Sequence, residues 1–303
     1  MGSSLLTNST AMTALQTLRT TGAALSNTQN RISTGQRVAT ASDNAAYWSI
    51  ATSMRADNAA LSAVSDSLGL SAATVDTEYT ALTSVLGSDG NSGLTKLQAL
   101  LVEAKTAGID RDKIQSEVTQ IQADMKNTAN SATFNGVNWL STTTATPATF
   151  DLVSSYSRVG STPTTASITL TMSNYSLYTS SQGGFLDTAT SGVSVDNMDI
   201  SSLTDSTTDM ATLDTYISAV TAAINSVASA AADLGAVKNR ISNNTEFVKT
   251  LMDSVTRGIG QLVDADMNAE STRLSALQTQ QQLGIQALSI ANNNSQSILS
   301  LFR

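Results

Sequence analysis

Three carboxylates lie close together near the end of the chain, in the stretch VDADMNAE. Asp264, Asp266 and Glu270 could in principle bind a metal ion or act as an acid and base pair. The chain contains no histidine and no cysteine, so it lacks the usual general base near neutral pH, thiolate metal ligands and a cysteine nucleophile. We therefore interpret the three acids as solvated residues at a junction between helices. We expect no catalytic, cofactor-binding or metal-binding residues, and no enzyme.

The charge of the chain argues against a nucleic-acid partner. Its net charge is −8, and its sixteen basic residues are scattered rather than clustered, whereas phosphate binding needs grouped Lys and Arg. Charged residues make up 13% of the chain, against roughly a quarter in a typical globular protein. A surface with so few charges can pack against copies of itself with little desolvation cost.

The first residues, MGSSLLTNSTAMTAL, do not form a secretory signal, because they have neither a basic start nor an apolar stretch of signal length. No run approaches the roughly 18 apolar residues that span a membrane, so we expect no membrane insertion. These features alone predict a cytoplasmic protein.

The positions of proline divide the chain into three parts. Pro147 and Pro163 are the only prolines, and the flank on each side is free to form long helices. The middle stretch, residues 141–204, is rich in Ser, Thr, Gly and Asn and contains the alternating segment SITLTMSNYSLY. Ile168, Leu170 and Met172 there would point to one side of a half-buried strand. A small β-rich insert between two helical arms is the simplest interpretation.

The two arms carry apolar residues at heptad spacing, which is typical of helices packed lengthwise at coiled-coil angles. The first run contains Tyr47, Ile50, Met54, Asp57, Leu61, Val64, Leu68, Ser71, Val75, Glu78, Leu82 and Val85. The second contains Leu213, Ile217, Val220, Ile224, Val227, Ala231, Leu234, Lys238, Ile241, Thr245, Val248, Met252, Val255, Ile259 and Leu262. A third, shorter run contains Ile114, Val118, Ile121 and Met125. We predict a mainly α protein, a long antiparallel helical bundle or coiled-coil rod formed by both chain ends. Lys238 within the second run should be paired or extend its ammonium group to solvent.

Both ends of the chain continue the heptad and also carry apolar residues outside it. The heptad residues are Ala11, Leu15, Leu18, Gly22, Leu25 and Ile32 at one end, and Leu277, Gly284, Leu288, Ala291, Ile298 and Phe302 at the other. The residues outside it are Leu5, Leu6, Leu274, Leu283, Ile285, Ile290 and Leu301. A pair of helices cannot cover a second apolar face, so something outside the monomer must bury it. We expect subunit contacts at Leu5, Leu6, Leu15, Leu18, Leu25, Ile32, Leu274, Leu277, Leu288, Ile298, Leu299, Leu301 and Phe302.

Three segments, in this order, resemble the bacterial flagellins. The stretch RISTGQRVATASDNAAYWSIATSMRADNAALSAV resembles their amino-terminal segment, and FNGVNWL at Phe134–Leu140 resembles the turn after their third helix. The ending LVDADMNAESTRLSALQTQQQLGIQALSIANNNSQSILSLFR is similar to their terminal helix. The pair Tyr47-Trp48 and the short middle look similar to flagellins of α-proteobacteria.

The resemblance implies a self-assembling, extracellular subunit of the flagellar filament, and it replaces the cytoplasmic prediction. It implies an inner tube of terminal helices (1–42 and 263–303), an outer tube of long helices (43–140 and 205–262) and a surface-exposed variable domain (141–204). It also implies export by the flagellum's own secretion apparatus with an export chaperone and no cleaved signal peptide, and contact with filament cap and hook-junction proteins. We expect the insert, Thr142–Leu203, to be dispensable for polymerisation.

Two alternatives stay open at this point: a hook–filament junction protein of the same family, and a secreted enzyme or binding module carried by the insert. Seeding with filament fragments separates them, because only the filament subunit elongates the seeds. Many flagellins also carry an Arg and a Glu that immune receptors of the Toll-like class recognise. Gln98 and Ala99 occupy those places in this chain, which implies weak receptor activation.

Overall fold

The structure is a computed structural model that describes residues 8–87, 89–142, 149–160, 162–189 and 192–300, with side chains as far as residue 293. The chain is mostly helical and folds as two compact units, one from residues 8–59 and 253–300 and the other from residues 60–252. The helices are α1 (Ser9–Thr34), α2 (Ala45–Leu86), α3 (Gly93–Glu103), α4 (Arg111–Ser131), α5 (Thr207–Val263) and α6 (Met267–Ser300). The strands are β1 (Ser141–Thr142), β2 (Thr149–Val159), β3 (Thr162–Thr171) and β4 (Tyr178–Thr179).

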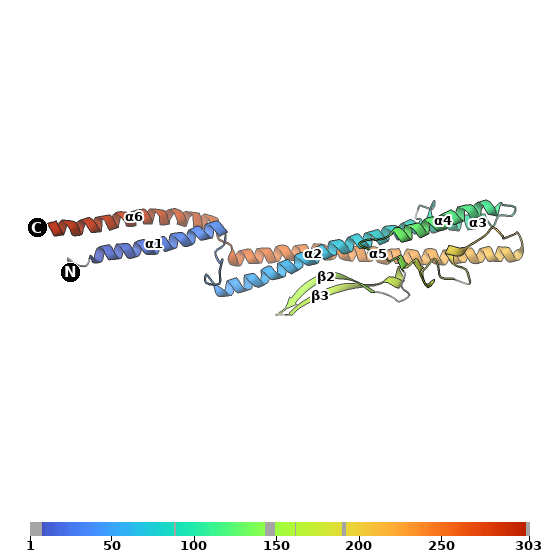
Figure 1. The fold of residues 1–303 in the computed structure, drawn as a ribbon, viewed down its shortest axis with the longest axis horizontal. Helices are drawn as coiled ribbons and strands as arrows, with labels where there is room; N and C mark the ends of the chain where they lie inside the picture. Colours follow the sequence, from blue (N-terminus) through green and yellow to red (C-terminus); the bar gives the residue numbers. More distant parts are fainter. Residues whose placement is uncertain (1–7, 88, 143–148, 161, 190–191, 301–303) are drawn as a thin grey trace. The chain divides into compact units, whose positions relative to one another are not determined.

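In the second unit, α5 runs antiparallel to α2 and α3 (Figure 1). Asp76 of α2 pairs with Lys238 of α5 at 2.8 Å, and Lys105, just after α3, pairs with Asp214 at 2.5 Å. Residue numbers therefore rise along α2 and α3 while they fall along α5. The predicted antiparallel packing of these helices is confirmed. Lys238 is paired as expected, and its ammonium group also lies 5.9 Å from the centroid of the Tyr79 ring.

The predicted heptads form the core between these helices. The heptad residues that are buried on α2 are Leu61, Val64, Leu68, Ser71, Val75, Glu78, Leu82 and Val85, and those on α5 are Leu213, Val220, Val227, Ala231, Leu234, Ile241 and Val248. Ile114, Val118 and Met125 are buried on α4. One stretch of α5 is long and apolar enough to cross a membrane by length and composition alone. Its heptad residues are buried, so the apolar character of this stretch is accounted for by packing in the protein core.

A tight glycine turn joins α2 to α3. Gly87 and Gly93 both have positive φ, at 70° and 58°. A β-carbon on Gly93 would come within 2.1 Å of the Val85 carbonyl oxygen, so no other residue fits there without moving the backbone. The turn is therefore held closely against the end of α2.

The middle of the chain forms a β-hairpin, in which β2 and β3 pair antiparallel with an irregularity between Val153 and Ser155. Ile168 and Leu170 are buried, as the alternation predicted. Met172 lies instead in a short 3₁₀ helix that begins where β3 ends, so the strand is shorter than expected. A second, two-residue pairing joins β1 to β4 in parallel.

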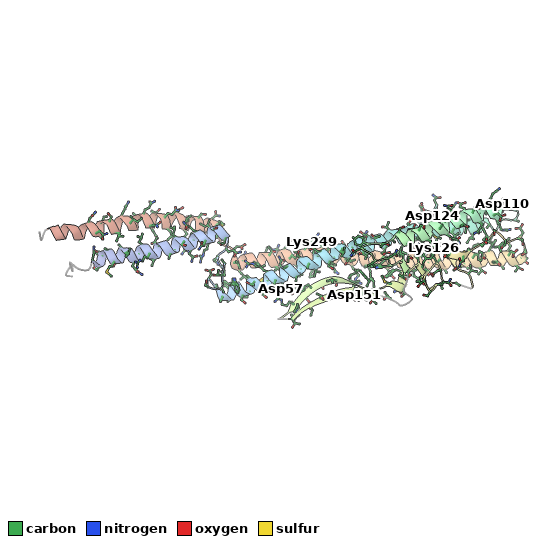
Figure 2. The ribbon with its side chains drawn as sticks, viewed as in Figure 1. Asp57, Asp110, Asp124, Lys126, Asp151 and Lys249 are labelled. Atoms are coloured by element: carbon green, nitrogen blue, oxygen red, sulfur yellow. The ribbon has the colours of Figure 1, made fainter. Side chains whose placement is uncertain are left out.

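The rest of the insert is part of the core of the second unit. Leu177, Leu186 and Ile200 are fully buried. The amide of Gln122 on α4 donates to the carbonyl oxygens of Val195 (2.8 Å) and Met198 (3.3 Å). Lys126, which is labelled in Figure 2, pairs through its ammonium group with Asp196 at 2.8 Å. The segment after the hairpin is thus bound to α4 by packing and by specific hydrogen bonds, which its Ser/Thr-rich composition did not reveal.

Candidate assembly surface

In the first unit, α1 and α6 lie side by side (Figure 1), and each presents a heptad stripe that is buried or half-buried. On α1 the stripe consists of Ala11, Ala14, Leu18, Thr21, Leu25, Thr28 and Ile32. On α6 it consists of Glu270, Leu274, Leu277, Gln281, Gly284, Leu288 and Ala291. These residues recur at steps of three and four, so the predicted pairing of the two terminal helices is confirmed over the described side chains.

Two leucines lie on a different face from the one predicted. Leu15 was expected in the stripe, but it is 37% exposed and Ala14 takes its place. Leu274 was expected outside the stripe, but it is half-buried within it. At Leu15 the prediction chose a large apolar residue over the small Ala14 beside it. This choice placed the buried stripe one residue, or about 100° around the helix, away from where it lies.

Small residues let the two helices approach closely. A β-carbon added to Gly284 would lie 3.2 Å from Cδ1 of Leu18. Asn8, at the start of α1, links this helix to α6, because its side-chain amide donates to the Ala291 carbonyl oxygen at 3.0 Å. The side-chain oxygen of Asn8 also accepts from the Ala11 backbone N–H at 3.0 Å and so caps α1.

Two of the three carboxylates have structural partners at the start of α6. Asp266 accepts hydrogen bonds from the backbone N–H groups of Asn268 (2.9 Å) and Ala269 (3.2 Å), as a helix-capping aspartate does. Glu270 pairs with Arg31 at 3.1 Å and is buried, so the prediction that this acid is solvated was wrong. The helix junction itself is confirmed.

A short backbone pairing fixes the turns that follow α1 and precede α6. The N–H of Arg37 donates to the Val263 carbonyl oxygen at 2.6 Å, and the N–H of Ala265 donates to the Gly35 carbonyl oxygen at 2.9 Å. Val38 and Val263 pack there with Ala51 of α2 in a small core. Ala51 is fully buried, whereas Tyr47 and Ile50 are exposed, so the first heptad began on the wrong residues.

Large apolar side chains are also exposed on the outside of the helix pair. Met12 on α1 is 64% exposed, and Leu283, Ile285 and Ile290 on α6 are 58%, 54% and 67% exposed. A self-sufficient helix pair would present polar residues there. Burying such side chains is favourable, so this face is suited to contact with other apolar surfaces.

The residues expected to make subunit contacts do not all lie on this outer face. Leu18, Leu25, Ile32, Leu277 and Leu288 contribute to the stripe between α1 and α6. Ile298 and Leu299 lie within α6, whereas Leu5, Leu6, Leu301 and Phe302 lie outside the described residues. The predicted contact set omitted Met12, Leu283, Ile285 and Ile290. The signal that identifies them is apolar character at positions between the heptad steps.

The family model of the bacterial flagellin N-terminal helical region matches residues 5–145, and that of the C-terminal helical region matches residues 217–302. The chain belongs to the bacterial flagellin family. It is 44% identical to flagellin C of Rhizobium meliloti (strain 1021) over 326 residues, which cover 99% of each chain. It is 45% identical to the flagellin of Brucella melitensis biotype 1 over 301 residues, again 99% of each chain. Flagellin A of Rhizobium meliloti is 38% identical over 398 residues, covering 99% of this chain and all of the relative.

Membership in this family assigns the protein's class. This flagellin is a structural subunit of the bacterial flagellar filament, in which it assembles with copies of itself outside the cell. The expectation of a cytoplasmic protein, drawn from the missing signal features, is thereby overturned. The family is structural rather than enzymatic. The resemblance to α-proteobacterial flagellins is confirmed by the Rhizobium and Brucella relatives.

Proposed function

We propose that this flagellin polymerises through the outer faces of α1 and α6, where neighbouring subunits bury Met12, Leu283, Ile285 and Ile290. Residues 1–42 and 263–303 would then form the inner tube, and residues 43–140 and 205–262 the outer tube around it. Residues 141–204 would face the surface of the filament. The observation that carries the proposal is the apolar outer face of a helix pair whose inner stripe is already filled.

The energies involved are sufficient for assembly. Complete burial of one large apolar side chain contributes roughly 1.5–3 kcal/mol, and these four are now more than half exposed. An open helical polymer needs different surfaces to meet on neighbouring subunits. Leu283 and Ile290 on α6, which lie on one side of that helix, and Met12 on α1 provide two such surfaces. The residues of the predicted contact set near the chain ends would extend them.

The test is seeded assembly of a Leu283→Ser, Ile290→Ser double variant, followed by sedimentation and electron microscopy. Both side chains are exposed in the single subunit, so the variant should fold like the parent while its critical concentration for polymerisation rises at least tenfold. Val159→Ser is the matched control, because Val159 is 78% exposed at the end of β2, in the other compact unit. A double variant that elongates seeds like the parent would refute this assembly surface. Seeds that the parent caps without elongating would indicate a junction protein instead.

The family membership also supports a route of export. We infer that the chain leaves through the flagellum's own secretion apparatus with the help of an export chaperone, and that it meets cap and hook-junction proteins at the filament ends. No cleaved signal peptide is required on this route. Intact-mass measurement of the filament protein tests this: it should retain the residues that follow the initiator methionine, and loss of an amino-terminal segment of signal length would contradict the inference.

A further inference from the structure

Glu78 is a carboxylate in the middle of an apolar core. It occupies a heptad position on α2 and has no exposed surface. One of its oxygens, Oε1, accepts a hydrogen bond from the backbone N–H of Trp139 at 3.0 Å. The other, Oε2, finds no partner among the described protein groups. A buried carboxylate with one satisfied oxygen is costly when it is charged.

Its partner, Trp139, connects several parts of the second unit. The indole ring is fully buried, with its centroid 5.3 Å from that of Phe150 on β2 and 6.2 Å from that of Tyr175 after β3. The indole N–H, like Glu78 Oε2, has no partner in the described part of the chain. The hydrogen bond from Trp139 to Glu78 therefore links α2 to the aromatic cluster at the base of the hairpin.

The charged groups on the elements packed here are engaged with other partners. On the helices, Asp76 of α2 pairs with Lys238 of α5. On β2, Asp151 accepts from the Thr169 hydroxyl at 2.6 Å. The segment Phe134–Leu140 carries no titratable side chain.

The two nearby tyrosines provide no charged partner for Glu78. Tyr79, the next residue on α2, lies beneath the Lys238 ammonium group. Burial raises the pKa of the Tyr175 phenol, and Asp233 on α5 raises it further, so this ring stays neutral. Burial likewise raises the pKa of Glu78 from 4.5 to about 7, while the Trp139 N–H opposes the shift.

We propose that Glu78 is a proton-operated latch, which holds Phe134–Leu140 and the base of the hairpin on α2 when it is protonated and loosens them when it is ionised. The neutral carboxyl group can stay buried and still accept the Trp139 N–H. The ionised carboxylate in the same place lacks the solvation that water would give it. This property belongs to the single subunit and does not depend on the proposed assembly surface.

The sign of the pH dependence follows from the two protonation equilibria. Between about pH 4.5 and 7 the unfolded chain has lost the Glu78 proton while the folded chain keeps it. Proton binding is then greater in the folded state, so the stability contributed by this site falls as pH rises through that window and is constant above it. Opening of the latch should increase severalfold between pH 6 and 8. The limit for complete exposure is a few hundred-fold, set by the change in pKa from 4.5 to about 7.

The experiment uses the full-length chain with Trp48→Phe, which leaves Trp139 as the only tryptophan. Its fluorescence is recorded from pH 5 to 8.5, together with hydrogen exchange of the Trp139 amide, corrected for the intrinsic pH dependence of exchange. We expect the emission to titrate near pH 7 and the amide to lose protection over the same range. Glu78→Gln should abolish both changes and melt at a higher temperature than the parent at pH 8.

Two comparisons keep the test decisive. Glu246→Gln, an exposed glutamate on α5, should leave the titration unchanged. Infrared spectroscopy of the chain with Glu78 intact should show a protonated buried carboxyl band that disappears with the same midpoint, which needs no core variant to fold. A titration that survives Glu78→Gln, or a flat profile and no such band with Glu78 present, would overturn the latch.

Discussion

Gly284 of α6 lies against Leu18 of α1, so closely that a β-carbon at Gly284 would come within 3.2 Å of the leucine Cδ1. This contact sits halfway along the described stripe, between Gln281 and Leu288 on the same face of α6. Glycine is otherwise unfavourable in a helix interior, by roughly 0.5–1 kcal/mol relative to alanine. Because glycine has no side chain, the two helices can pack closely at this position.

Gly284→Val should therefore loosen the α1–α6 pair. Forcing extra carbon atoms into a packed contact costs about 1–3 kcal/mol, which corresponds to roughly five- to 150-fold faster hydrogen exchange of the α6 amides. The matched control is Gly22→Val on α1, since a β-carbon at Gly22 meets nothing within 4 Å. Equal exchange in the two variants would show that Gly284 does not set the approach of the helices.

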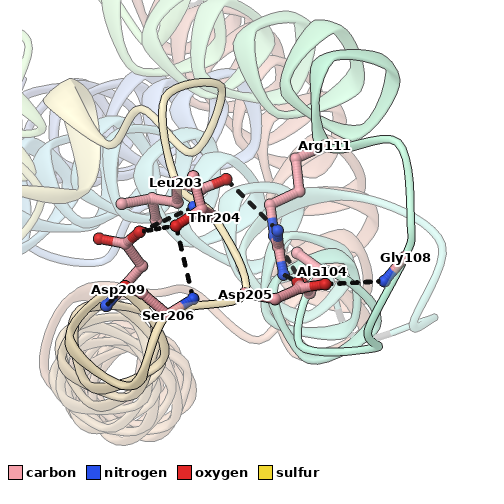
Figure 3. A network of polar contacts seen from close by, with 8 residues as sticks. All are labelled: Ala104, Gly108, Arg111, Leu203, Thr204, Asp205, Ser206 and Asp209. Atoms are coloured by element: carbon pink, nitrogen blue, oxygen red, sulfur yellow. Dashed lines mark hydrogen bonds and ion pairs between the residues drawn. The ribbon is translucent and has the colours of Figure 1, made fainter.

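Arg111 ties together three segments of the second unit (Figure 3). Its guanidinium donates to the Ala104 carbonyl oxygen (3.0 Å), to the Leu203 carbonyl oxygen (3.3 Å) and to the Asp205 carboxylate (2.6 Å). Asp205 in turn accepts from the Gly108 N–H at 3.1 Å. The end of α3, the start of α4 and the chain that leads into α5 are thus held by one buried side chain.

Arg111→Leu should lower the free energy of unfolding of this unit by about 2–3 kcal/mol, because two carbonyl groups lose a charged donor at once. Urea unfolding followed by circular dichroism measures the loss. Lys113→Leu is the control: Lys113 is 85% exposed, and its pair with Asp110 should contribute little. A similar loss in both variants would refute the anchoring role.

The same cluster predicts an acid dependence. The hydrogen bond from Arg111, and then that from Gly108, hold the pKa of Asp205 below its ordinary value of 3.8. Stability from this interaction is present above pH 3.8 and is lost as pH falls through the lowered pKa. The difference in stability between the parent and Arg111→Leu should accordingly shrink below pH 4. A difference that stays constant down to pH 2.5 would assign the loss to packing alone.

The sequence was sufficient to predict the helical core, because apolar residues at heptad spacing determine which face is buried. From Leu61 to Val85 every predicted heptad residue is buried, and Thr74 and Ala81 are buried beside them. The prediction slipped by one residue at Ile50 and Leu15, where a large side chain stands beside the small alanine that is buried in its place. Assigning the larger of two neighbouring apolar residues to the core works where helices are widely spaced. It fails where small residues such as alanine allow the helices to pack closely.

The core role of residues 175–200 could not be predicted, because only a few apolar residues carry it. Leu177, Leu186 and Ile200 are separated by polar segments without regular spacing. Hydrogen bonds with α4 hold those segments in place: Gln122 donates to Val195, and the Ile200 N–H donates to Gln115. Neither a period of two nor one of 3.6 identifies such a stretch. The latch at Glu78 was equally hidden, since its partner Trp139 lies 61 residues away in the chain.

Because Leu177, Leu186 and Ile200 are buried, most of the insert is needed for folding. We now expect only the outer half of the hairpin to be dispensable for polymerisation. Replacing residues 156–165 by an Asn-Gly turn keeps the buried Leu152, Ile168 and Leu170 and removes mainly exposed residues. We expect filaments to form and the stability to change by no more than about 0.5 kcal/mol. Replacing Thr142–Leu203 by a Gly/Ser linker should instead prevent cooperative folding, since each lost core leucine costs about 2–5 kcal/mol. Calorimetry and electron microscopy of both variants test this, and a well-folded longer deletion would contradict it.

Receptor activation provides a prediction about the outside of α3. Gln98 donates its side-chain amide to the Thr221 hydroxyl at 2.8 Å, and Ala99 is exposed. Neither can supply the Arg and Glu that the resemblance to receptor-activating flagellins calls for at these places. Two charge-assisted hydrogen bonds are missing, each contributing roughly 1.5–3 kcal/mol, so depolymerised protein should be weaker than a strong flagellin agonist by two or more orders of magnitude.

A Toll-like-receptor reporter-cell assay on depolymerised protein measures this difference. Gln98→Arg together with Ala99→Glu should raise the response. Thr221→Ala is the control for the hydrogen bond that Gln98→Arg must break, because it removes the same bond without adding charge and should leave the response low. A parent protein that matches the strong agonist would refute the assignment of these two residues, since the helix would then activate the receptor without either charge.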